Sequence, residues 1–183
     1  RTYAEINLLN DPLRILRCFR FVSELNFKID QKLILFIKKN KSKLYLVAKE
    51  RINYEIKKIV NGANALDAVL LIKKLNIFGS ENLYKDSFFL DLKKINYAEL
   101  NQHEKEEFLP FFFITQILDI VSLEELKFSK AEIAKTNLLR KWHFFLKDKN
   151  IAHLNELERF KLHQELEMFL PSFILYLPQT LHF

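Results

Sequence analysis

The residues of this sequence best suited to ligand chemistry are an aspartate and three arginines near its amino terminus. Asp11 is followed by a proline, which is typical of a helix that starts with an aspartate cap. Arg14, Arg17 and Arg20 follow at intervals of three, so at about 100° per residue they share one face of that helix. A carboxylate only accepts hydrogen bonds and a guanidinium only donates them. For Asp11 the structural alternative is a plain helix cap. For Arg17 and Arg20 it is an exposed basic stripe or an ion pair with Glu24.

Other kinds of chemistry find little support in the composition. The 183 residues include only two glycines, which argues against the glycine-rich loops that bind phosphates or dinucleotides. The single cysteine, Cys18, cannot form an internal disulfide, and we expect an inert core thiol in a reducing, cytoplasmic compartment. The five histidines lack metal-ligand spacing and no Asp-x-Asp occurs, so we expect this chain to bind no metal.

Two aromatic clusters are predicted to lie in the core rather than to stack on nucleic-acid bases. Trp142 is followed by His143, Phe144 and Phe145 within a helical pattern. The other cluster is the run of three phenylalanines at 111–113. Both clusters fall on predicted helices, where bulky apolar side chains usually face the core.

Positive charge is concentrated in the first third of the chain. Residues 1–60 contain 14 Lys and Arg against six acids, a balance of +8, whereas the whole chain carries +6. A polyanion would therefore be met in this region. The alternative is a solvated lysine face, enriched by an A+T-rich genome. The basic residues between two predicted helices of this region are Lys38, Lys39, Lys41 and Lys43.

The elements that must position these residues are predicted to be helices, because glycine and proline are rare and apolar residues recur with the 3.6-residue period. We see no period-2 strand pattern and therefore expect an all-α fold, a multi-helix array. The segment 81–94 stays ambiguous, and Pro110 should start or kink a helix. Helices are predicted over residues 11–25, 30–39, 48–60, 63–75, 102–121, 129–145 and 155–169.

Two domains are expected, a first one over 1–62 and a second over 63–183. The seam is placed at Asn61-Gly62, where the sequence predicts the end of a helix. The apolar runs are too short to span a membrane, so we expect a soluble chain.

Two stretches resemble the neck signatures of a known enzyme family. The first is N-D-P-L-R-I-L-R-C-F-R-F over residues 10–21, and the second is A-K-E-R-I-N-Y-E-I-K-K-I over residues 48–59. They are similar to the patterns Glu-Asp-Pro-x-Arg-x-Leu-Arg-x-x-Arg-Phe and Ser/Ala-x-Glu-Arg-Ile-x-x-Glu-Leu-x-Lys-Ile. Both patterns belong to class II tRNA nucleotidyltransferases and the related bacterial poly(A) polymerases. The resemblance is strong over residues 1–62 and fades by about residue 78.

The resemblance implies a template for the incoming nucleotide that is made of protein. Asp11 and Arg14 occupy the positions that pair with the Watson–Crick edge of CTP or ATP in this family. Arg17 and Arg20 would support that template or the triphosphate. An acceptor beside a donor matches cytosine and adenine, whereas guanine and uracil would leave polar groups unpaired at a cost of ~1–3 kcal/mol each. The family's glutamate before the aspartate is Asn10 here, which removes a charge.

Two further expectations come with the resemblance. Arg51, with Glu50 or Glu55, should form a salt-bridge network that braces the neck. The four lysines Lys38, Lys39, Lys41 and Lys43 should contact the phosphates of the tRNA acceptor arm.

The catalytic head of this family holds magnesium between paired aspartates, and no part of this sequence matches it. We therefore expect the chain to begin after the head and to be inactive alone, while the full-length enzyme adds CCA, CC or A to tRNA. The sequence does not separate these activities from that of a poly(A) polymerase, and it leaves the oligomeric state open. The alternative is a non-catalytic helical RNA-binding or protein-interaction module.

Overall fold

All regular structure in the described part of the chain is helical. The computed structural model describes residues 3–79, 101–146, 149 and 153–167, and these ranges contain no β-strand. The all-α prediction is therefore confirmed. Within the same ranges, no helix combines the length and the apolar character that a bilayer crossing requires. The ambiguous segment 81–94 lies outside the described residues.

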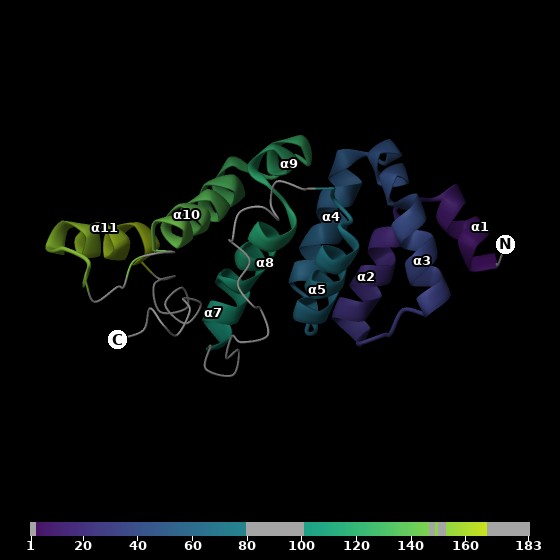
Figure 1. Ribbon diagram of the computed structural model, residues 1–183, viewed down its shortest axis with the longest axis horizontal. Helices are drawn as coiled ribbons and strands as arrows, with labels where there is room; N and C mark the ends of the chain where they lie inside the picture. Colours follow the sequence, from purple (N-terminus) through teal and green to yellow (C-terminus); the bar gives the residue numbers. More distant parts are fainter. Residues whose placement is uncertain (1–2, 80–100, 147–148, 150–152, 168–183) are drawn as a thin grey trace.

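The first part of the chain folds into a compact group of helices, drawn from purple to blue in Figure 1. In this group α2, α4 and α5 pack against one another, and α1 contacts α2 and α3. Their apolar faces share one core, with Leu16 of α2, Ile56 of α4 and Ala68 of α5 fully buried. The elements are α1 (Tyr3–Asn10), α2 (Arg14–Leu25), α3 (Gln31–Asn40), the 3₁₀ helix η1 (Lys41–Leu46), α4 (Lys49–Val60) and α5 (Ala65–Leu75).

The second group of helices extends from the first, so that α1 and α11 lie at opposite ends of the array (Figure 1). Helix α8 joins the groups, because it packs against α4 and α5 on one side and α10 on the other. The elements are α7 (Gln102–Glu107), α8 (Leu109–Ile117), α9 (Ile120–Glu125), α10 (Lys130–Leu146) and α11 (Glu156–Leu166). The proposed division at residue 62 stays a prediction.

Polar contacts from α4 also reach the second group. The buried Asn53 amide donates to the carbonyl oxygen of Leu126 at 2.9 Å. The Lys57 ammonium lies 2.7 Å from the Glu132 carboxylate, and Lys127 pairs with Glu50. One helix of the first group is therefore fixed along most of its length to Leu126, Lys127 and the first turn of α10.

Side-chain caps explain why several predicted boundaries hold. Asp30 accepts from the backbone N–H groups of Lys32 and Leu33 and starts α3 as predicted. Asn155 and Glu158 form a reciprocal capping box at the start of α11.

One helix was not predicted, and one prediction about helix extent is wrong. The helix that was not predicted is α1, although Thr2 and Glu5 have the spacing of a capping box. The single helix predicted over 102–121 is divided into α7, α8 and α9. Pro110 lies in the first turn of α8, and the extended backbone at Leu118 ends that helix. The Asp119 carboxylate then accepts from the N–H of Ser122 at 2.7 Å and starts α9.

Gly62 lies where α4 ends, but its role differs from a helix-ending conformation. A Cβ atom there would meet the side chain of Ser23 at 2.1 Å and its backbone at 2.9 Å. The Ser23 hydroxyl in turn donates to the carbonyl oxygen of Ile59 at 2.5 Å. The glycine is therefore required by the close approach of α2 to the α4–α5 turn.

The aromatic clusters lie mostly in the core, as predicted. Trp142 and His143 are buried, as are Phe112 and Phe113. The prediction is wrong for Phe144, which is 71% exposed, because α10 turns this position away from α8.

Candidate functional site

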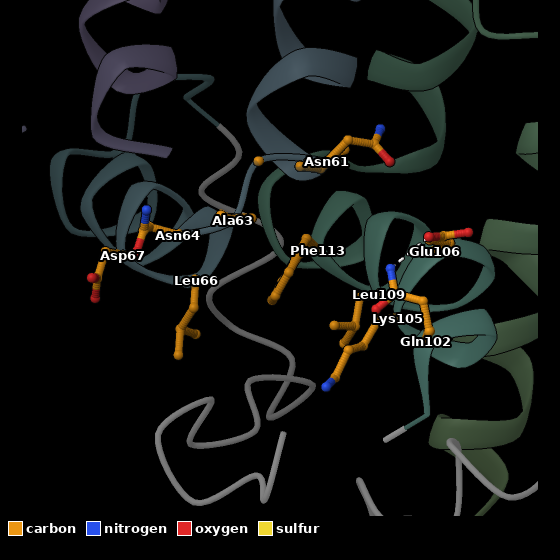
Figure 2. Close-up of a pocket in the computed structure, with 13 residues that line it drawn as sticks. Asn61, Ala63, Asn64, Leu66, Asp67, Gln102, Lys105, Glu106, Leu109 and Phe113 are labelled. Atoms are coloured by element: carbon orange, nitrogen blue, oxygen red, sulfur yellow. Dashed lines mark hydrogen bonds between the residues drawn. The ribbon is translucent and has the colours of Figure 1, made fainter. Parts of the chain in front are cut away.

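A cavity of about 670 Å³ opens beside the turn between α4 and α5 (Figure 2). Asn64 and Asp67 line it from the start of α5, and Lys105, Leu109 and Phe113 line it from α7 and α8. None of the site residues predicted from the sequence is among the described residues that line it.

The predicted site lies instead around the turn that precedes α2. The N–H of Arg14 donates to the carbonyl oxygen of Asp11, and that of Ile15 to Pro12, both at 3.0 Å. These two bonds form a tight turn, so α2 begins at Arg14 with the buried Leu13 at its N-cap position and no side-chain cap. The prediction that Asp11 caps this helix is therefore wrong, and its carboxylate has a different set of partners.

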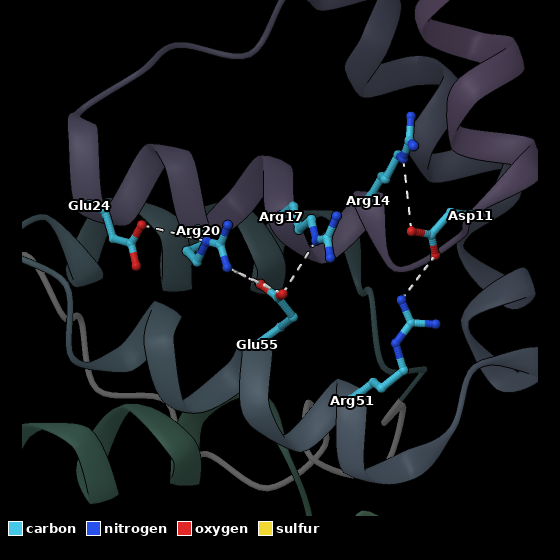
Figure 3. Close-up of polar contacts among 7 residues, drawn as sticks. All are labelled: Asp11, Arg14, Arg17, Arg20, Glu24, Arg51 and Glu55. Carbon is cyan, nitrogen blue, oxygen red and sulfur yellow. Dashed lines mark hydrogen bonds and ion pairs between the residues drawn. The ribbon is translucent and has the colours of Figure 1, made fainter.

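Two arginines face the Asp11 carboxylate from different elements (Figure 3). One oxygen lies 3.8 Å from Nε of Arg14, and the other lies 3.6 Å from Nη2 of Arg51 on α4. The side chain of Asp11 is 26% exposed, that of Arg14 44% and that of Arg51 53%. Both separations exceed hydrogen-bond length, so the carboxylate is held by charge while its oxygens stay accessible.

Arg51 was expected to pair with Glu50 or Glu55, and this expectation is wrong. In the described residues Glu50 pairs with Lys127, while Arg51 reaches across to Asp11. The first turn of α4 points Arg51 toward the turn before α2 (Figure 3).

Arg17 and Arg20 converge on Glu55, whose side chain is only 3% exposed. Nε of Arg17 lies 3.4 Å from one oxygen of Glu55, and Nη1 of Arg20 lies 3.1 Å from the other. Arg20 also pairs with Glu24 at 3.5 Å, the contact named in the structural alternative for this residue. The arginine face of α2 is thus joined to α4 by a buried acid.

Sequence reasoning did not assign Glu55 to this role, although a signal exists. On a helical projection Glu55 falls next to Ile52, Ile56 and Ile59, the apolar face of α4. A carboxylate in such a position requires cationic partners from a neighbouring element, because an unpaired buried charge is costly.

The four predicted RNA-binding lysines differ in their surroundings. Lys38 and Lys39 are exposed in the last turn of α3, and Lys43 is partly buried in η1. The Lys41 ammonium donates to the carbonyl oxygens of Leu75 and Asn76 and so satisfies the carboxyl end of α5. Lys41 therefore has a structural contact that the other three do not show.

Cys18 lies half-buried against the core of α2, as its position on the apolar face predicts. Burial raises the pKa of its thiol, which disfavours the reactive thiolate. Among the described residues no group of three or more His, Cys, Asp or Glu side chains is placed to hold a metal ion.

Comparison with known proteins gives two kinds of match. Residues 26–80 match the family model described as the probable RNA- and SrmB-binding site of polymerase A. The CCA-adding enzyme of Staphylococcus haemolyticus is 31% identical over 138 residues, covering 75% of this chain and 33% of that enzyme.

Shorter matches include a tRNA nucleotidyltransferase of Schizosaccharomyces pombe, 41% identical over 75 residues, covering 39% of this chain and 16% of that protein. The CC-adding tRNA nucleotidyltransferase of Shouchella clausii is 40% identical over 63 residues, covering 34% and 17%. The chain thus spans a third or less of the length of these relatives. By these matches, and by the helical array that carries both neck signatures, the chain belongs to the family of CCA-adding tRNA nucleotidyltransferases and poly(A) polymerases as a neck and body region.

Proposed function

We propose that this chain is the nucleotide-selecting and tRNA-binding part of a tRNA nucleotidyltransferase that adds CCA, CC or A to tRNA 3′ ends. CTP and ATP are its nucleotide substrates, and Asp11 with Arg14 forms the template for the incoming base. The catalytic head with its magnesium ions is supplied by another part of the protein. We assign the chemical step to that head because no part of this sequence matches its paired aspartates.

The observation that carries the proposal is the side-by-side exposure of an acceptor and a donor at the start of α2. The contact of Arg14 with a carboxylate is through Nε, 3.8 Å from Asp11, so its two Nη groups can donate to a base. The Asp11 oxygens lie beyond hydrogen-bond distance from either arginine, so they can accept from an exocyclic amino group. Cytosine and adenine present this combination of groups.

Discrimination follows from what uracil and guanine would present to the same pair. Their carbonyl oxygen would face the Asp11 carboxylate, so two acceptors would oppose each other. Each polar group left unpaired in this way costs about 1–3 kcal/mol, and about 1.4 kcal/mol corresponds to a tenfold preference.

The proposal is tested with Asp11→Ser in the full-length protein that contains this chain. Because Asp11 does not cap α2, the substitution should leave the melting temperature within about 2 °C of the wild type. Misincorporation of UTP and GTP relative to CTP and ATP should rise about tenfold or more, since a serine hydroxyl can donate to a carbonyl. Arg14→Ala should instead lower the incorporation of both correct nucleotides, because it removes a charge-assisted bond.

Intact selectivity in Asp11→Ser, with a folded protein, would contradict the template. Such a result would favour the alternative of a non-catalytic RNA-binding or protein-interaction module. A processive product of many adenylates on a general RNA would indicate a poly(A) polymerase within the same family.

Contact with tRNA is the second part of the proposal. It is supported by the matched RNA-binding family model, by relatives named as tRNA nucleotidyltransferases and by the +8 balance of residues 1–60. The exposed Lys38 and Lys39 are the described lysines of the predicted set best placed to meet phosphates.

A further inference from the structure

We propose that Arg51 is a positioning residue that keeps Asp11 and Arg14 from neutralising each other and thereby sets base selectivity. This inference rests on the proposed function and deepens it. It assigns to the second neck signature a role in nucleotide choice, although that signature lies forty residues from the template.

The first step is the competition for one carboxylate. Asp11 and Arg14 are three residues apart and carry opposite charges, so without another cation they would close into a direct ion pair. Arg51 faces the other oxygen of Asp11, and its separation of 3.6 Å is slightly shorter than the 3.8 Å to Arg14. The carboxylate is therefore shared between two cations and is not closed onto Arg14.

Among the residues that the structure describes, Arg51 is the only cation besides Arg14 that pairs with the Asp11 side chain. Asp11 lies in the turn between α1 and α2, and α2 has no side-chain cap. In the described residues its ion pairs are those with Arg14 and Arg51. Since Arg14 must itself bind the base, Arg51 is the residue left to orient the carboxylate.

The backbone of Arg51 is held in place by the packing of α4. It lies in the first turn of α4, next to the buried Ile52, and one helical turn before Glu55. Glu55 is bound by Arg17 and Arg20 of α2, the helix that follows Asp11. The buried contact therefore fixes the register between the helix that carries Arg51 and the helix that the template opens (Figure 3).

The test compares Arg51→Gln, Arg51→Lys and the control Lys58→Gln in the full-length protein. Lys58 is a cation on the same helix whose described contact is with the ring of Tyr54, at 4.6 Å from the ring centroid. For Arg51→Gln we expect KM for CTP and ATP to rise about tenfold, because the closed Asp11–Arg14 pair must open before a base binds. Discrimination against UTP and GTP should fall by a similar factor. Arg51→Lys should keep KM and discrimination close to their wild-type values, and Lys58→Gln should change neither KM nor discrimination.

A double-variant cycle separates positioning from a direct role. If Arg51 acts through Asp11, adding Arg51→Gln to Asp11→Ser should change selectivity less than twofold. An undiminished effect in that background would show that Arg51 acts elsewhere and would overturn this inference. The proposed template would still stand if Asp11→Ser alone loses selectivity. Unchanged selectivity in Arg51→Gln, with Asp11→Ser affected, would also overturn the inference alone, whereas unchanged selectivity in both would reject the template as well.

Discussion

Glu55 is the residue on which the geometry of the site depends most, because a single buried carboxylate receives two arginines. The side chain is 3% exposed, whereas those of Arg17 and Arg20 are 40% and 17% exposed. Both arginines keep part of their hydration, but within the described residues one oxygen of Glu55 is buried without a hydrogen-bond partner, so the contact carries a desolvation penalty. The arrangement fixes orientation more than it adds net stability.

Glu55→Gln should lower the free energy of unfolding by about 2–3 kcal/mol, because it leaves two cations facing a neutral amide at a buried position. Urea unfolding of this chain measures the change. Glu50→Gln is the matched control on the same helix, since Glu50 and Lys127 form an exposed pair and their loss should change little. If Glu55→Gln and the wild type had equal free energies of unfolding, the contact with Arg17 and Arg20 would not contribute to stability.

At the scale of the helices, the sequence predicted those whose ends carry a local signal. Asp30 starts α3 and Asn76 ends α5 in the left-handed conformation, and both residue types are typical of these positions. Helix α1 was missed although Thr2 and Glu5 have the spacing of a capping box, and in the structure it contacts α2 and α3. The division of 102–121 depends on the extended backbone at Leu118, which the apolar period does not reveal.

The site was predictable to a similar degree. The proximity of Asp11 to Arg14 follows from their spacing in the sequence. The turn that places Leu13 at the N-cap position instead of Asp11 could not be predicted from Pro12 alone. The prediction of the partner of Arg51 was wrong because the sequence does not show which helix faces the Arg51 side chain. Only the packing of α4 on α2 decides between its neighbour Glu50 and the distant Asp11.

The contact between α4 and α10 should make stability depend on pH in the acid range. Burial of the Glu132 carboxyl opposes ionisation, but hydrogen bonds from Lys57 and Ser129 outweigh it and lower its pKa below the ordinary 4.5. A carboxyl with a lowered folded pKa contributes stability above its unfolded pKa and loses it as pH falls through the folded value. Glu132→Gln should therefore cost about 0.5–1 kcal/mol near pH 7, discounted because Lys57 is 42% exposed.

The measurement is the unfolding free energy of the wild type and of Glu132→Gln between pH 7 and pH 3. The gap between the two proteins should close below about pH 4. A gap that stays constant over this range would mean that the carboxyl does not titrate differently in the folded and unfolded chains.

At the scale of the whole molecule, the lysines of the first third are of two kinds. Some, such as Lys38 and Lys39, are exposed, whereas Lys41 binds backbone carbonyl oxygens. Replacing Lys38 and Lys39 by alanine in the full-length protein should weaken tRNA binding for all sequences alike. Each lost phosphate contact should reduce the slope of log affinity against log salt by about one. Melting temperature should not change, because both side chains are exposed.

Lys41→Ala provides the contrast. It should lower the melting temperature by several degrees, since two carbonyl oxygens at the carboxyl end of α5 lose their donor.

An unchanged salt dependence of tRNA binding in the variant that lacks Lys38 and Lys39 would show that these two lysines are only a solvated face.

The contacts of α4 have a mechanical consequence for the array. Twelve residues of helix extend about 18 Å and bend little compared with the side-chain contacts at their surface. Asn53 and Glu50 join this helix to Leu126 and Lys127, and Lys57 joins it to the first turn of α10, while Arg51 extends from a different face toward Asp11. A force that displaces the segment between α9 and α10 must therefore break those ties or carry α4 with it. In the second case the Glu55 contact passes the displacement on to α2, so strain applied at one group of helices is delivered at the other.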